Sequence, residues 1–92
     1  PNLPNPNLPG LSDIINIIPN PSTQPPRIER ECDFTYEVFD ALGREVTRGA
    51  SRNLGVRLPR RIGVGQFSIR TVPTGQAAQT CETATARFTV LG

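Results

Sequence analysis

The chain has 92 residues, and its ten basic residues, all arginines, outweigh eight acidic ones to give a formal net charge of +2. So small a charge gives no argument for a nucleic-acid partner. No apolar run approaches the roughly 18 residues of a transmembrane helix, so we expect no membrane insertion. There is no histidine, which excludes Ser-His-Asp and Cys-His catalysis, and two cysteines are too few for a structural zinc site. We therefore expect neither an enzyme nor a metal or other cofactor.

The first 26 residues differ from the rest of the chain. They contain eight of the ten prolines, and Asp13 is their only charged residue. The tetrapeptide Pro-Asn-Leu-Pro occurs at 1–4 and 6–9, and this proline spacing predicts an extended polyproline II conformation. The P-x-x-P spacing could bind an aromatic groove, although a stiff spacer is the simpler interpretation. Because disordered tails usually stay soluble through charge, we predict that residues 1–26 are a docking segment covered by another molecule, and that residues 27–92 form the folded domain.

An apolar stretch, "LSDIINIIPNP", lies inside this segment. The spacing of Leu11 and three of its isoleucines favours one face of a helical turn that begins after Ser12 and ends at Pro19. The β-branched isoleucines favour a short strand as the alternative. Either element is too short to be stable alone and must pack against something. The candidate docking residues are Leu11, Ile14, Ile15, Ile17 and Ile18.

From residue 27 the chain changes to short runs that alternate between apolar and polar residues, with turn signals about every ten residues. The "DALG" run at 40–43 predicts a turn in which Gly43 takes a positive φ. In the last run, Phe88 and Val90 fall on the same face of a strand, whereas Cys81 would fall on the opposite face. This predicts either a bulge or a strand that begins after Cys81. We expect strands over 32–39, around Val46, over 54–58 (with Leu54, Val56 and Leu58 on one face), over 66–72 and in 81–91. This pattern is typical of an all-β sandwich of five to seven short strands.

The two cysteines lie near the two ends of the compact region. A folded part of roughly 65 residues has a small core and usually needs a staple. A disulfide between Cys32 and Cys81 would contribute roughly 4 kcal/mol in the chain-entropy model. The alternative is two separate buried thiols. A disulfide would indicate an oxidising compartment, so we expect a secreted, extracellular protein.

A resemblance covers residues 34–92. The runs "YEVFDALGREVTRG", "VRLP", "GVGQFSIRTV" and "ARFTVLG" resemble the small immunoglobulin-like and transthyretin-like modules of secreted proteins. In those modules, a strand, a D-x-x-G turn and a second strand precede a G-x-Phe/Tyr-x-I/V strand and a final strand ending in F-T-V. The resemblance implies an immunoglobulin-like β-sandwich and a secreted setting, but no activity. Gln79 stands where antibody domains carry a tyrosine before the second cysteine, so the pairing of Cys32 with Cys81 is not expected to link the two sheets in the antibody manner.

Six arginines gather between residues 44 and 61, where Glu45 is the only acid. Arginine binds carboxylates in bidentate fashion, so this strip could contact acidic groups on a neighbouring molecule. A solvated sheet face is the more ordinary interpretation. The candidate interface residues are Arg44, Arg48, Arg52, Arg57, Arg60 and Arg61.

These features lead to three hypotheses about function. The first is a structural subunit of an extracellular filament or matrix, a homopolymer in which the N-terminal tail of one copy docks on the sandwich of the next. The second is a monomeric secreted adhesion or ligand-binding immunoglobulin-like module, whose tail packs on its own sandwich and whose loops at 48–53 and 71–79 bind the ligand. The third and weakest is a protease-inhibitor-like domain that exposes residues 58–61.

Overall fold

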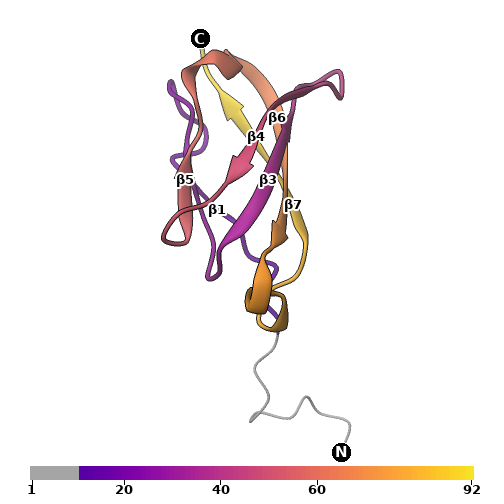
Figure 1. Ribbon diagram of the computed structural model, residues 1–92. Helices are drawn as coiled ribbons and strands as arrows, with labels where there is room; N and C mark the ends of the chain where they lie inside the picture. The colour runs from indigo at the N-terminus through magenta and orange to yellow at the C-terminus, as the bar shows by residue number, and fades with distance from the viewer. Residues whose placement is uncertain (1–10) are drawn as a thin grey trace, which may run out of the picture.

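The computed structural model describes residues 11–92, which form two antiparallel β-sheets (Figure 1). One sheet has the order β1-β2-β5, with β1 (Asn16–Ile18), β2 (Arg27–Glu29) and β5 (Gly55–Arg57). The other has the order β4-β3-β6-β7, with β3 (Phe34–Phe39), β4 (Glu45–Ala50), β6 (Gly65–Pro73) and β7 (Ala84–Val90). Two short 3-10 turns, η1 (Arg60–Ile62) and η2 (Gly75–Gln79), complete the described chain. The predicted all-β class is confirmed.

Membrane-spanning helices are not found in the described part of the chain, since none of its helical segments is long and apolar enough to cross a bilayer.

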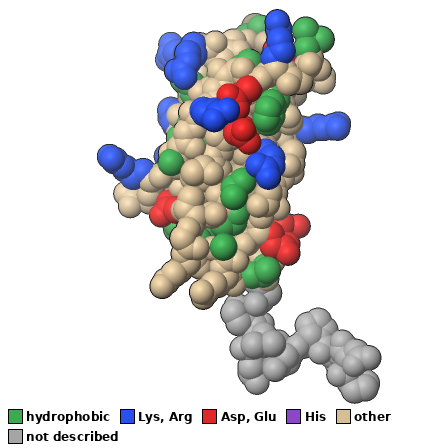
Figure 2. All heavy atoms as spheres, turned by 45° about the vertical axis from the view of Figure 1, so that its right-hand side comes forward, with side chains coloured by type: hydrophobic (Ala, Val, Ile, Leu, Met, Phe, Trp, Pro, Cys, Tyr) green, Lys and Arg blue, Asp and Glu red, His purple; other side chains and the backbone are tan. Residues whose placement is uncertain are grey.

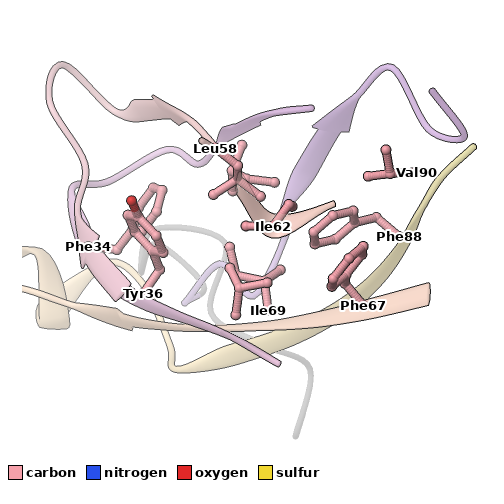
Figure 3. Close-up of a cluster of buried hydrophobic side chains, with 10 residues drawn as sticks. Phe34, Tyr36, Leu58, Ile62, Phe67, Ile69, Phe88 and Val90 are labelled. Atoms are coloured by element: carbon pink, nitrogen blue, oxygen red, sulfur yellow. The ribbon is translucent and has the colours of Figure 1, made fainter. Parts of the chain in front are cut away.

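The hydrophobic core lies between the two sheets. On β6, Phe67, Ile69 and Thr71 are buried while their neighbours face outward, as the alternation predicted. Phe67 stacks on Phe88 of β7 with ring centroids 5.4 Å apart, because the two residues are paired across the strands. The buried cluster consists of Ile28, Phe34, Tyr36, Val38, Leu58, Ile62, Phe67, Ile69, Phe88 and Val90 (Figure 3).

The strand predicted around Val46 is confirmed as β4, in which Thr47 is buried and Val46 only partly so, because the ladder with β3 shifts at this point and Val46 is the extra residue of a bulge. The strand predicted over 54–58 was wrong in detail. Leu54 is 44% exposed rather than on the inner face with Leu58, because it takes a positive φ of 71° in the turn before β5. Gly43 takes its predicted positive φ, and β7 begins at Ala84, which confirms a strand that starts after Cys81.

The N-terminal segment is extended and packs on its own chain. Its centre, β1, pairs with β2, while Ser12 bridges to Cys81 and Ser22 bridges to Val90 of the opposite sheet. The predicted helical turn over residues 11–18 is wrong. Residues 16–18 pair with β2 as a strand, the conformation that β-branched isoleucine favours. The predicted boundary at residue 27 falls between β1 and β2, so residues 11–26 here belong to the sandwich. The polyproline II conformation predicted for residues 1–10 lies outside the described residues.

Cys32 and Cys81 form a disulfide across a sequence separation of 49 residues, as predicted. Cys32 lies between β2 and β3, and Cys81 lies just before β7, so the bond joins two connections at one end of the sandwich. We call this the disulfide end; η2 lies here too, and it is the lower end in Figure 1. At the opposite, open end lie the β3–β4 turn, η1 and the C-terminus.

Candidate functional site

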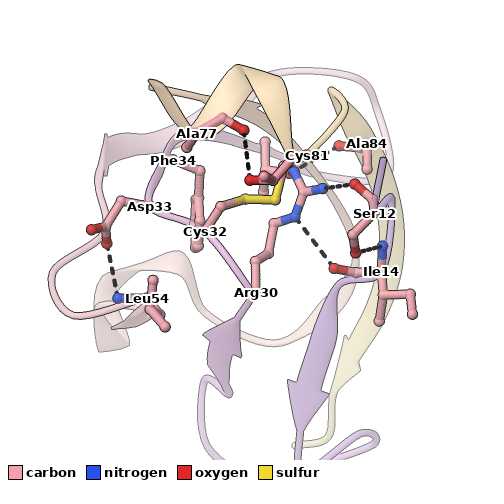
Figure 4. The surroundings of a disulfide bond; sticks show 12 residues. Ser12, Ile14, Arg30, Cys32, Asp33, Phe34, Leu54, Ala77, Cys81 and Ala84 are labelled. Carbon is pink, nitrogen blue, oxygen red and sulfur yellow. Dashed lines mark hydrogen bonds between the residues drawn. A yellow bond between two sulfur atoms is a disulfide. The ribbon is translucent and has the colours of Figure 1, made fainter. Parts of the chain in front are cut away.

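Arg30 fastens the N-terminal segment to the sandwich. It is only 3% exposed, and its guanidinium donates hydrogen bonds to the carbonyl oxygens of Ser12 (2.9 Å) and Ile14 (3.3 Å) (Figure 4). A third hydrogen bond, of 2.8 Å, goes to the hydroxyl of Thr71. Burial lowers the pKa of Arg30, and the charge of Asp13 acts in the opposite direction. Because its buried guanidinium bonds to two backbone carbonyls, Arg30 holds residues 12–14 against the core.

The sequence analysis missed Arg30, although a signal was present. Ile28, Arg30, Cys32 and Phe34 are buried at alternate positions. The apolar alternation of the 32–39 run therefore continues backward through residue 30, and this inward parity marks Arg30 as a buried cation with nearby acceptors.

The five candidate docking residues separate into two groups. Ile15 and Ile17 are partly buried and pack against the core of their own chain. Leu11, Ile14 and Ile18 remain 48%, 55% and 51% exposed. In this structure only the second group offers apolar surface to another molecule.

Asp33 organises the loops at the disulfide end. Its carboxylate accepts hydrogen bonds of 2.8 Å from the Ser51 hydroxyl and from the Leu54 amide, and its carbonyl accepts one of 3.2 Å from the Thr74 amide. The hydrogen bonds from Leu54 and Ser51 lower the pKa of Asp33. The predicted ligand-binding loops at 48–53 and 71–79 are shorter than expected, because residues 48–50 belong to β4 and residues 71–73 to β6. The connections that follow these two strands are both bonded to Asp33.

The six arginines of the strip differ in their contacts. Arg44 pairs with Asp40 at 2.9 Å, and Arg48 pairs with Glu45 at 2.8 Å and with Glu37 at 3.9 Å. Arg61 donates to the hydroxyl of Thr47, and within residues 11–92 Arg52, Arg57 and Arg60 form no ion pair. Figure 2 shows acidic side chains between arginines on one face. Exposed pairs of this kind contribute roughly 0–1 kcal/mol each, so they mainly neutralise the face.

Residues 58–61 do not form a protruding loop. Leu58 is 3% exposed and Ile62 is 8% exposed, so the segment that carries Arg60 and Arg61 is held in the core on both sides of them.

A groove of about 380 Å³ with both polar and apolar lining residues lies at the open end, between the β3–β4 turn and residues 62–67. Its walls include Leu42 and Val64, whose side chains are 78% and 64% exposed. The charge at its rim is already paired, because Asp40 accepts hydrogen bonds from Arg44 and from the Leu42 amide. The groove is lined by Asp40, Ala41, Leu42, Arg44, Val46, Ile62, Val64, Gly65, Gln66 and Phe67.

The described residues contain no group of three or more histidine, cysteine, aspartate or glutamate side chains that could hold a metal ion. No match to this chain was found among protein-family models, curated proteins or solved structures.

Proposed function

We propose that this protein is a non-enzymatic structural subunit of an extracellular filament or matrix, an immunoglobulin-like sandwich that assembles head to tail with its own copies through the N-terminal region. Because residues 11–26 pack on their own chain, the part of the tail that docks on the neighbour is residues 1–10.

The observation that carries the proposal is the placement of exposed apolar side chains at the two ends of the sandwich. Leu11 and Ile14 lie toward the disulfide end. Leu42, Val64 and Leu91 lie at the open end. Exposed apolar surface on a small domain marks a site of association. Two different surfaces at opposite ends make a heterologous contact, which propagates into a filament unless rotation closes a ring.

Two of the four sheet edges carry features that oppose pairing with another sheet. The edge strand β4 carries the paired charges of Glu45 and Arg48, and the edge strand β5 has only three residues. Short, charged edges are how natural sheets avoid pairing with other sheets. Lateral strand addition at β4 and β5 is therefore disfavoured.

The strand orders β1-β2-β5 and β4-β3-β6-β7 support the immunoglobulin-like assignment. In such sandwiches, strands that follow one another in the chain, as β2 and β3 do here, lie in different sheets. The disulfide supports the extracellular setting, since such bonds persist in oxidising compartments.

The monomeric adhesion or ligand-binding module is the second candidate. The packing of residues 12–22 on their own sandwich favours it, as does the gathering around Asp33 of the two connections that follow β4 and β6.

Light scattering and negative-stain microscopy of the oxidised full chain, over a hundredfold range of concentration, separate the two candidates. The structural subunit predicts a mass that rises with concentration and particles one domain wide. A constant monomer mass would reject the filament and favour the binding module.

A further inference from the structure

We propose that the groove at the open end binds residues 1–10 of a second copy of this chain. The inference rests on the proposed function, and it names the two surfaces that meet.

Residues 1–10, which we call the leader, join the described chain at Leu11, and the place of this junction favours binding to a second copy over binding to the same chain. Ser12 lies level with Cys81 at the disulfide end, whereas Gly65, at the groove, pairs with Val90. Nine residues of near-extended chain separate these levels, or roughly 25–30 Å. Leu8 lies only three residues before Leu11, so it reaches at most about 11 Å from it. Leu8 therefore cannot enter the groove of its own molecule. Leu3, eight residues before Leu11, reaches at most about 29 Å, so within one chain no more than one of the two leucines could bind, whereas a second copy can accept either.

The chemistry of the leader matches that of the groove. Residues 1–10 have no charge, and each Pro-Asn-Leu-Pro unit offers one leucine between prolines. The groove offers the exposed side chains of Leu42 and Val64, and its rim charges Asp40 and Arg44 are paired with each other. A volume of about 380 Å³ falls in the range of sites that hold small ligands. A proline-rich segment loses little entropy on binding, because its sequence already favours the extended conformation.

Two full-length variants separate the two halves of the contact. The acceptor variant carries Leu3→Ser and Leu8→Ser, so it keeps the groove and loses the leucines of the leader. The donor variant carries Leu42→Ser and Val64→Ser, so it keeps the leader and loses the groove walls. Both groove residues are largely exposed, so the donor variant should fold, as near-UV circular dichroism checks. Leu54→Ser, at the disulfide end, is the matched control for an exposed apolar position.

We expect the wild type and the Leu54→Ser control to form oligomers over the same concentration range. Each variant alone should need at least a tenfold higher concentration. An equimolar mixture of the two should stop at the dimer, because one leader enters one groove and no second contact remains.

The contact is wrong if either folded variant assembles as the wild type does, or if the mixture stays monomeric. In those cases the wild type still forms polymers and the structural function stands. If the wild type is itself a monomer throughout the range, the proposed function and this contact both fail, and the leader then binds its own chain or an unrelated partner.

Discussion

The two ends of this small sandwich are built in different ways. At the disulfide end, a covalent bond, the buried Arg30 and the bonded Asp33 connect four segments that are distant in sequence. At the open end, the turn at Asp40 is closed by local contacts, and the apolar Leu42 and Val64 remain in solvent. We propose that the disulfide end supplies stability and that the open end supplies the contact with another copy. Substitutions at one end should therefore change stability, and substitutions at the other should change assembly.

The largest effect should come from the disulfide. Replacing both Cys32 and Cys81 by alanine frees a loop that spans 49 residues, and we expect a loss of roughly 4 kcal/mol in the free energy of unfolding. Urea denaturation of the oxidised wild type, the reduced wild type and the double variant measures it. A loss below about 1 kcal/mol would show that the disulfide end does not depend on its staple.

Removal of the Arg30 guanidinium should have the next largest effect. Arg30→Leu leaves the carbonyls of Ser12 and Ile14 and the hydroxyl of Thr71 without their donor, and we expect a loss of about 2–4 kcal/mol.

The same variant should release the N-terminal segment. Hydrogen exchange at the amides of Ser12 and Glu82, which are bonded to Thr80 and Ser12, should become faster. Arg57→Leu is the control, because Arg57 forms no ion pair in the described chain. If both variants behave alike, Arg30 does not anchor the segment.

A smaller effect should appear in acid. The folded-state pKa of Asp33 lies below its unfolded value of about 3.9, so its contribution to stability is complete above about pH 4 and is lost as the pH falls through the folded pKa. Asp33→Asn should therefore flatten the decline of the thermal midpoint below pH 4. A residual slope should remain, because the pKa values of Asp40 and Glu45 are also lowered. An unchanged slope would contradict the role given to Asp33.

The smallest effect on stability should come from the open end. Leu42→Ser and Val64→Ser should each change the free energy of unfolding by less than about 0.5 kcal/mol, because both side chains are exposed. Urea denaturation at a concentration below assembly tests this. A loss above about 1.5 kcal/mol would mean that the groove walls belong to the core, and the two ends would not be separable.

The sequence predicted the parts of the fold that depend on local alternation. The inward faces of β3 and β6, the turn at Gly43 and the pairing of Cys32 with Cys81 follow from parity, turn chemistry and cysteine count. Long-range pairing decided the rest. The isoleucines of residues 14–18 fit a helix or a strand equally well on spacing, and only the neighbouring β2 selects the strand. The bulge at Val46 reverses the parity of β4, which no local pattern indicates.

The surfaces were predicted less completely than the fold. The tail and its apolar character were visible in the sequence, but not the packing of residues 11–26 on the chain's own sandwich. The groove was not visible, because Leu42 and Val64 lie 22 positions apart and meet only through the arrangement of the turn and β6. Arg30 was visible in retrospect through its parity with Ile28 and Cys32.

The most direct test of the account is an isotope-filtered NMR measurement on the mixed dimer of the acceptor and donor variants, with only the acceptor labelled. The account predicts intermolecular cross-peaks from the methyl groups of Leu42 and Val64 in the labelled chain to the unlabelled leader of its partner. Cross-peaks confined to Leu11, Ile14 or Ile18 would place the contact elsewhere and contradict it.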